Sequence, residues 1–281
     1  METTRSKFTG SDQEYLRDVQ YRDGSRLARR ANLHAKYRTA STPFFDWVGA
    51  HFDLFGGAEV LEVGCGTGWL WQESSFDIPP GVKLTLTDLS PGMVKEAVAR
   101  VEAAGRVETV AGQPADAQSL PFENGSFDRV VANHMLYHLP DPALGVAELA
   151  RVVRSDGVVI ASTNGSEHLR ELWEMRAKVF GTSPVDETAT VFNPEIGFEL
   201  LREHFAEVDW FDYPDQLICT DPVDVLAHIC SAPPAETATP EQLSHLTDEV
   251  ERAFNAGGGR LMVTKEVGCF VTRGQRKRPR R

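Results

Sequence analysis

The sequence predicts an α/β fold, a doubly wound Rossmann-like sheet of about seven mostly parallel strands with helices on both faces. Three observations indicate this fold. Short apolar runs alternate with amphipathic stretches between residues 58 and 164, which is typical of strands that pair in parallel through right-handed crossovers. A glycine-rich turn follows the first apolar run, and an acidic residue ends the second. The 281 residues are enough for one such core with added helical segments.

The individual elements follow from the periodicity of the apolar residues. Strands are expected at 58–63, 82–88, 106–112, 126–135, 157–164, 207–213 and 265–273. Helices are expected within 16–50, at 67–76, 90–104, 142–153, 168–180 and 194–205, and twice within 221–257. Ser90 and Pro91 give the clearest helix start, because serine caps free backbone N–H groups and proline suits the first helical position. Ser155-Asp156-Gly157 predicts a turn before the fifth strand.

The charge balance argues against a nucleic-acid substrate. The net charge is -12, and six of the 29 basic residues lie in the last nine positions, 273–281, which leaves 23 basic residues against 41 acidic ones elsewhere. An acidic body repels a phosphate backbone. The basic tail is expected to be a disordered, solvated end, with polyanion binding as the alternative.

Neither a membrane segment nor a metal site is expected. No apolar run approaches 18 residues, and the first 15 residues have no apolar signal core, so we expect a cytoplasmic protein. The four cysteines have no short spacing of the zinc or redox type and are expected to be structural thiols: Cys65, Cys219, Cys230 and Cys269.

The chemistry is expected at the turn after the first strand. Gly64, Gly66 and Gly68 allow a backbone bend that brings a ligand close. Their spacing is G-x-G-x-G, whereas the dinucleotide fingerprint is G-x-G-x-x-G. Glu62 precedes the first glycine and would repel a pyrophosphate, so a cofactor with an ammonium group suits the site better. Asp88 ends the second strand, where a carboxylate can accept both hydroxyl groups of a ribose.

Three segments carry a family resemblance: VLEVGCGTG (60–68), TDLSPGMV (87–94) and LPFENGSFDRVVANHMLYHL (120–139). In this order and spacing they resemble the motifs of class I S-adenosylmethionine (SAM)-dependent methyltransferases, of the UbiE-like type that acts on small molecules. The resemblance covers roughly residues 55–165. It implies SAM as the cofactor, S-adenosylhomocysteine as its product, and a transferase activity.

The resemblance also implies a set of cofactor residues. Glu62 would act near the ammonium group of SAM, Asp88 would hold the ribose, and Asp116 would meet the adenine amino group. Asn133 and His134 would line the methyl-donor end. The full implied set is Glu62, Gly64, Cys65, Gly66, Gly68, Asp88, Leu89, Met93, Asp116, Ala117, Asn133 and His134. Asp128 departs from this set, because its place at the start of a strand predicts a structural role.

Candidate catalytic residues follow the fourth strand. His138, His134 and Tyr137 could act as a general base or shape the pocket. The two histidines are four residues apart and would share one face of a helical turn. Since the sequence offers no third ligand within reach, a metal is not expected.

Candidate substrate residues lie in the helical additions: Tyr21, His34, Tyr37, Trp173 and Phe180. The amino-terminal segment could close over SAM and exclude water, or simply pack on the sheet. The same segment carries a neighbouring basic face, made of Arg22, Arg26, Arg29 and Arg30. This face is expected to be solvated; the alternative is binding of a phosphate or carboxylate of the substrate.

These expectations define four segments and one leading function. We expect an amino-terminal helical lid (1–50), a SAM-binding core (51–165), the rest of the sheet with cap insertions (166–272) and a basic tail (273–281). The leading hypothesis is methylation of a small molecule of specialised metabolism at oxygen, nitrogen or carbon, with a homodimer left open. The alternatives are an NAD-dependent oxidoreductase, a SAM-binding regulator without catalysis, a methyltransferase of an anionic metabolite, and a nucleic-acid or protein modifier recruited by the tail.

Overall fold

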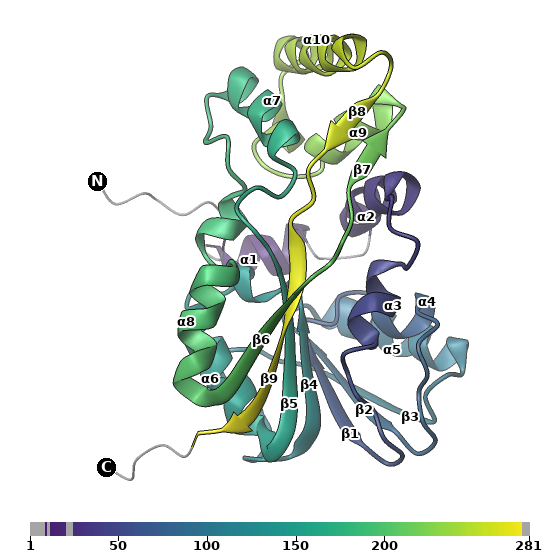
Figure 1. Cartoon of the computed structure of the whole chain (residues 1–281), viewed down its shortest axis with the longest axis vertical. Helices are drawn as coiled ribbons and strands as arrows, with labels where there is room; N and C mark the ends of the chain where they lie inside the picture. Colours follow the sequence, from purple (N-terminus) through teal and green to yellow (C-terminus); the bar gives the residue numbers. More distant parts are fainter. Residues whose placement is uncertain (1–8, 10–11, 21–24, 277–281) are drawn as a thin grey trace.

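A seven-stranded sheet forms the centre of the molecule (Figure 1). The computed structural model describes residue 9, residues 12–20 and residues 25–276, with the side chains of residues 20 and 25–30 outside that description. The strands are β1 (Glu59–Val63), β2 (Lys83–Asp88), β3 (Thr109–Pro114), β4 (Phe127–Asn133), β5 (Val153–Asn164), β6 (Phe205–Asp212) and β9 (Val267–Gln275). Their order is β3-β2-β1-β4-β5-β9-β6. Strands β1 to β5 are parallel and β9 runs antiparallel to both neighbours, which confirms the predicted sheet.

Helices cover both faces of the sheet (Figure 1). One face carries α3 (Phe44–Gly49), α4 (Trp69–Glu73) and α5 (Pro91–Ala104), and the other carries α6 (Pro142–Val152) and α8 (Pro194–His204). Helix α5 begins as predicted, since the Ser90 side chain accepts a hydrogen bond from Met93 N and Pro91 occupies the first turn. This arrangement is the doubly wound architecture in which ligands bind at the carboxyl ends of the strands.

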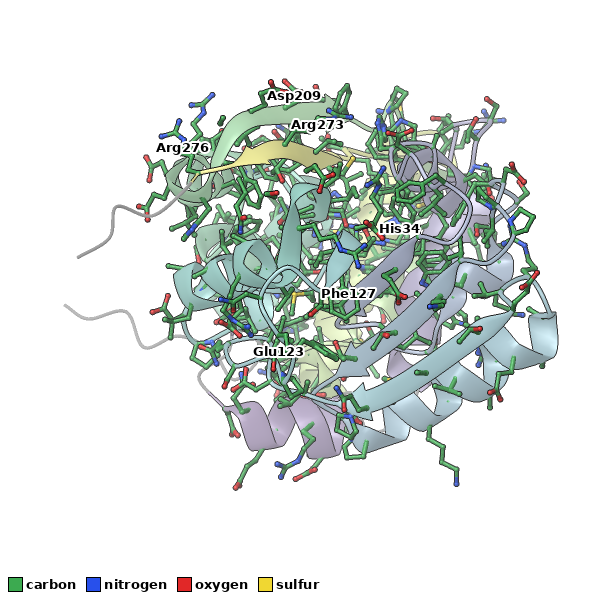
Figure 2. All side chains as sticks on the ribbon, turned by 90° about the horizontal axis from the view of Figure 1, so that it is seen from below. His34, Glu123, Phe127, Asp209, Arg273 and Arg276 are labelled. Carbon is green, nitrogen blue, oxygen red and sulfur yellow. The ribbon has the colours of Figure 1, made fainter. Side chains whose placement is uncertain are left out.

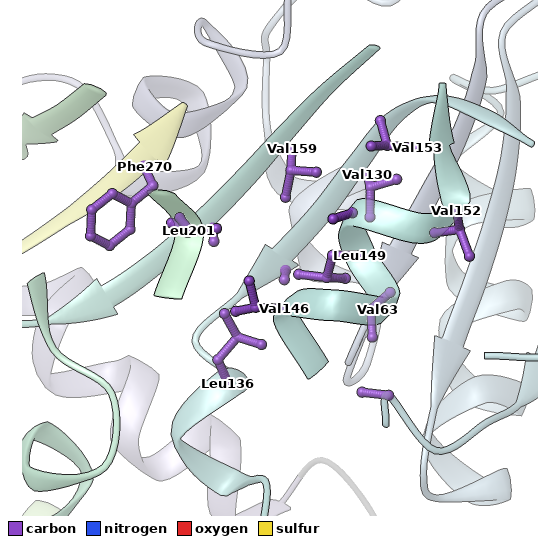
Figure 3. Packing of buried hydrophobic residues seen from close by; sticks show 14 of the residues in the cluster. Val63, Val130, Leu136, Val146, Leu149, Val152, Val153, Val159, Leu201 and Phe270 are labelled. Carbon is purple, nitrogen blue, oxygen red and sulfur yellow. The ribbon is translucent and has the colours of Figure 1, made fainter. Parts of the chain in front are cut away.

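The core on the α6 side is formed by branched aliphatic residues (Figure 3). Val130 and Val159 point from neighbouring strands toward Val146 and Leu149 of α6, and all four are fully buried. Burying each of these side chains contributes about 1.5–3 kcal/mol. The core therefore fixes β4 and β5 firmly, and it holds the loops at their carboxyl ends in place.

A helical cap stands above those carboxyl ends and has its own apolar cluster (Figure 1). It comprises α2 (Ser25–Tyr37), α7 (Arg170–Phe180), α9 (Pro222–Ile229), α10 (Pro240–Ala256) and the small antiparallel pair β7 (Leu217–Cys219) and β8 (Leu261–Val263). Two short segments, α1 (Gln13–Tyr15) and a π-helical turn (Leu16–Gln20), precede it. The sequence did not predict β7 and β8, because runs of three residues carry no periodicity.

Several boundaries differ from expectation. Strand β5 begins at Val153, so the predicted turn at 155–157 is instead part of the strand, next to a register shift opposite Phe127 and Arg129. Strand β9 continues to Gln275, three residues into the expected tail, because Arg273 pairs with Glu207 at the sheet edge. Figure 2 shows Arg273 beside Asp209 on that edge. Among the helices of the described residues, none combines the length and apolar character needed to cross a membrane.

Candidate functional site

A cavity of about 810 Å³ lies between the carboxyl ends of the strands and the cap. Its walls come from the β1–α4 turn, the ends of β2, β4 and β5, and the cap helices α2, α7 and α9. A volume of this size suits a cofactor and a small substrate together.

The glycine turn forms the floor of the cavity. Gly64, Gly66 and Gly68 all have positive φ angles, of 70°, 52° and 79°. A Cβ atom on Gly64 would lie 2.7 Å from Cβ of Met135, so this position excludes any side chain. Gly68 does not line the cavity; a Cβ atom there would lie 3.0 Å from Cα of Ala97, so the glycine allows α4 and α5 to pack closely.

Two buried carboxyl groups flank this turn. Asp88 accepts hydrogen bonds from Gly66 N (3.1 Å) and Ser90 N (2.9 Å), while burial raises its pKa. Glu62 is 2% exposed and accepts a hydrogen bond from Trp71 Nε1 at 2.7 Å. Burial raises the pKa of Glu62 to about 8. Both acids line the cavity and would be stabilised as carboxylates by a cationic ligand.

The cofactor half of the cavity fits SAM on the chemistry of its donors and acceptors. Thr67 Oγ1 and Asn133 Nδ2 are buried without a hydrogen-bond partner among the described residues, and both residues line the cavity. Asn133 Oδ1 is already engaged, because it accepts a hydrogen bond from Ser162 Oγ at 2.9 Å. A polar ligand would satisfy the orphaned atoms.

The residues expected around the adenine lie on one wall. Leu89, Asp116 and Ala117 line the cavity. The Asp116 carboxylate accepts a hydrogen bond from Gln118 N at 2.8 Å, which fixes its orientation. Met93 is fully buried at the start of α5 and supports this wall from behind without lining it.

His134, Tyr137 and His138 line the expected methyl-donor end. His134 has a φ of 50°, and its backbone N–H donates to Ser162 O at 3.2 Å. Burial, reinforced by nearby Lys265, lowers the pKa of His134 to about 4, so its imidazole is neutral at neutral pH. Residues 136–138 form a 3-10 turn, so the two histidines do not share a face of an α-helix as the spacing suggested.

The cap residues named from the sequence divide into three groups. His34 and Trp173 line the cavity. Tyr37 and Phe180 do not: the Tyr37 hydroxyl donates to Asp224 Oδ2 at 2.7 Å, and Phe180 packs in the apolar cluster of the cap. Tyr21 lies outside the described residues. The basic face proposed at Arg22, Arg26, Arg29 and Arg30 likewise has no described side chains.

The sequence reasoning also missed other cavity residues, among them His168, Tyr213, His228 and Lys265. A usable signal existed for two of them. His168 follows the end of β5 by four residues, and Lys265 precedes β9 by two. Because β9 is antiparallel, its beginning lies at the same edge of the sheet as the ends of the parallel strands. Polar residues at either place are candidates for the site.

Two other expectations concern structural residues and metals. Asp128 accepts a hydrogen bond from Glu59 N at 2.8 Å and pairs with Arg154, at the end of the sheet opposite the cavity, as its structural interpretation requires. Within the part of the chain that is described, no group of three or more histidine, cysteine or acidic residues could hold a metal ion. The four cysteines are free thiols, three of them buried.

Comparison with known proteins shows what the segment that contains the glycine turn is similar to. Residues 61–161 match the family model described as a methyltransferase domain. The malonyl-[acyl-carrier protein] O-methyltransferase of Hahella chejuensis is 40% identical over 116 residues, which cover 41% of this chain and 39% of that protein. A ubiquinone biosynthesis O-methyltransferase of Xanthomonas oryzae is 37% identical over 123 residues, covering 42% and 47%. The chain thus spans less than half of these relatives.

Solved structures share the fold. A phosphoethanolamine N-methyltransferase 2 of Haemonchus contortus, in complex with SAM, gives a TM-score of 0.57 at 16% identity and covers 94% of this chain and 60% of that one. The YcgJ protein of Bacillus subtilis gives 0.56 at 16% identity and covers 84% and 98%. With the glycine turn and both acids in place, residues 61–161 belong to the class I SAM-dependent methyltransferase family.

Proposed function

We propose that the whole protein transfers a methyl group from SAM to a small molecule of specialised metabolism. The single observation that carries this proposal is the cavity, which joins the glycine turn and its two acids to the space under the cap. The relatives named above methylate oxygen, by their names, and this supports a small-molecule substrate here. The cytoplasmic location, the homodimer and the four-segment division stay predictions.

The proposed reaction relies mainly on positioning and exclusion of water. SAM supplies an electrophilic methyl group carried on a positively charged sulfur. Glu62 and Asp88 would hold the ammonium and ribose groups, so that the methyl-donor end faces His134 and Tyr137. The cap would exclude water and hold the substrate in line for displacement. Neutral His134, or His138 beside it, would accept the proton of a hydroxyl nucleophile.

SAM binding is expected to become tighter with rising pH because of Glu62. At neutral pH much of this carboxyl group is protonated in the free protein, whereas the ammonium group of SAM favours the carboxylate. Binding therefore releases up to one proton, and affinity should rise by up to ~tenfold per pH unit between about pH 5.5 and about pH 7.5. Calorimetry in buffers of different ionisation enthalpy measures both quantities. Glu62→Gln should remove most of the slope; an unchanged slope would assign it to another group.

His138→Ala is expected to lower turnover by about 100-fold or more while leaving the Kd for SAM within about twofold, because a general base acts on the substrate and not on the cofactor. His138 is partly buried at the end of the 3-10 turn, and its carbonyl accepts a hydrogen bond from Gln13 Nε2 at 3.1 Å, a contact that the substitution keeps. The exposed His245→Ala is the matched control. Wild-type turnover in the His138 variant would leave His134 as the remaining base.

Incubation with methyl-labelled SAM and metabolite extracts, followed by mass spectrometry, tests the proposed function directly. A labelled small molecule together with S-adenosylhomocysteine is the expected result. Tight SAM binding with no S-adenosylhomocysteine from any extract would indicate the non-catalytic regulator instead. Loss of activity on removal of residues 277–281 would indicate a partner recruited by the tail.

A further inference from the structure

We propose that the cap end of the cavity is a binding site for the carboxylate group of the substrate. The site, which we call the histidine chamber, is formed by His34, His168 and His228, with Lys265 nearby and Trp173 beside His228. This inference rests on the proposed function for the place of the reaction. It adds the chemical class of the substrate, an organic acid.

The three imidazoles come from different parts of the chain and meet under the cap. His34 lies on α2, His168 lies between β5 and α7, and His228 lies in the last turn of α9. The ring centroids of His34 and His168 are 5.9 Å apart and nearly parallel, and those of His34 and His228 are 5.7 Å apart. Figure 2 shows His34 well inside the outline of the molecule. This is a cluster of basic groups lining one cavity.

Two of the ring nitrogens in the histidine chamber have no hydrogen-bond partner among the described residues. They are Nδ1 of His34 and Nδ1 of His168, and both atoms are buried. His168 is 4% exposed, so water does not replace that partner from the bulk solvent. Burying an imidazole nitrogen without a partner costs free energy, which a ligand would recover. The indole of Trp173 donates to the backbone carbonyl of His168 at 2.8 Å and keeps the loop in this position.

The charged groups around the histidine chamber favour binding of an anion. Burial has the largest effect on His34 and lowers the pKa of its imidazole. The pKa is lowered further by four neighbouring basic groups: Lys265, His228, His168 and His134. Burial and the neighbouring basic groups also lower the pKa of His168, and only a backbone hydrogen bond with Glu266 raises it.

The carboxylate beside Lys265 is already engaged, and burial raises the pKa of Asp186, the other acid on the cap side of the cavity. Asp215 pairs with Lys265 at 2.6 Å, and Arg38 is the next cation beyond them. By contrast, the acids Glu62 and Asp88 flank the glycine turn. The substrate would therefore supply the missing negative charge.

A singly charged carboxylate fits better than a phosphate. The imidazoles of His34 and His168 are neutral in the free protein, because burial and nearby Lys265 lower the pKa of both rings. A nearby carboxylate favours the charged form of a histidine and raises its pKa by about 1–3 units. One captured proton balances one carboxylate, whereas the second charge of a dianion would stay uncompensated in a buried site.

Acid binding is therefore coupled to proton uptake. In the pH window between the pKa values of the free and the occupied chamber, one proton is bound together with the acid. Affinity should fall as pH rises through this window, by up to ~tenfold per pH unit. This dependence is opposite in sign to the one expected for SAM at Glu62, so the two sites are distinguishable in one preparation.

Titration of the full chain, loaded with S-adenosylhomocysteine, with phenylacetate and with its neutral counterpart phenylacetamide tests the proposal. Calorimetry in two buffers counts protons, and ring-nitrogen NMR of ¹⁵N-histidine reports which imidazoles become charged. We expect phenylacetate to bind at least about tenfold more tightly near pH 6, with proton uptake, and the preference to shrink toward pH 8.5. His34→Gln combined with His168→Gln should abolish the preference, and the exposed His245→Gln should preserve it.

Three results would overturn the carboxylate site: equal affinity for the acid and the amide, an acid preference that persists in the double variant, or tighter binding of phenyl phosphate than of phenylacetate. The Kd for SAM is measured on the same samples. If SAM fails to bind, the proposed function fails whatever the acid does; if SAM binds and phenylacetate shows no preference, only the histidine chamber fails.

Discussion

Replacement of Asp88 by alanine is expected to weaken SAM binding by about 100-fold, which corresponds to about 2.8 kcal/mol. The substitution removes the carboxylate proposed to accept the ribose hydroxyl groups, and hydrogen bonds to a charged group contribute about 1.5–3 kcal/mol. It also leaves Gly66 N and Ser90 N without their acceptor, so the glycine turn loses its support. Calorimetric titration with SAM measures the change.

Asp128→Ala is the matched control for this loss. Asp128 is also a largely buried acid that accepts a backbone N–H, from Glu59, but it lies at the far end of the same sheet. Its replacement should lower stability and leave the Kd for SAM within about twofold. Asp88→Asn should fall between wild type and Asp88→Ala, because its amide oxygen can still accept one backbone hydrogen bond. Unchanged SAM affinity in Asp88→Ala would place the nucleoside elsewhere.

The sequence was sufficient to predict the core because its signals are local. The glycine spacing, the acid at Asp88 and the Ser90-Pro91 helix start each depend on a few adjacent residues, and the structure has all three at the expected elements. Boundaries were less accurate where tertiary pairing overrides local preference. β5 begins at Val153 because this residue pairs with Phe127 of β4, and the predicted turn at 155–157 is absorbed into the register shift between that pair and the next, Arg129 with Val158.

The cap was predictable only as a set of helices. Its β7–β8 pair joins residues more than 40 positions apart, Leu217 and Val263 among them, and the pairing leaves no local pattern. The histidine chamber has the same origin, since His34, His168 and His228 are distant in sequence and meet only when the cap folds. The Tyr37 hydroxyl contacts Asp224 and not the cavity, because α2 packs on α9, and no local sequence pattern predicts that packing.

The buried ion pair between Asp215 and Lys265 leads to the second large prediction. Their side chains are 0% and 6% exposed, and Asp215 also accepts hydrogen bonds from Thr39 N and Ala40 N, each at 2.9 Å. It therefore ties together three of the segments that run between sheet and cap. Asp215→Ala is expected to cost about 3–5 kcal/mol, because it leaves the buried Lys265 ammonium unpaired. Chemical denaturation measures this loss, and thermal unfolding should show a Tm lower by roughly 5–8 °C.

Substitution of the partner should cost less, and this asymmetry tests the argument. In Lys265→Met the Asp215 carboxylate keeps its two backbone hydrogen bonds, and methionine fills most of the volume of the lysine stem. The double variant Asp215→Asn with Lys265→Met should recover most of the stability lost in Asp215→Ala, because no buried charge remains and the amide oxygen still accepts a backbone N–H. If Lys265→Met were as destabilising as Asp215→Ala, the charge pair itself, and not the unpaired lysine, would dominate the stability of this junction.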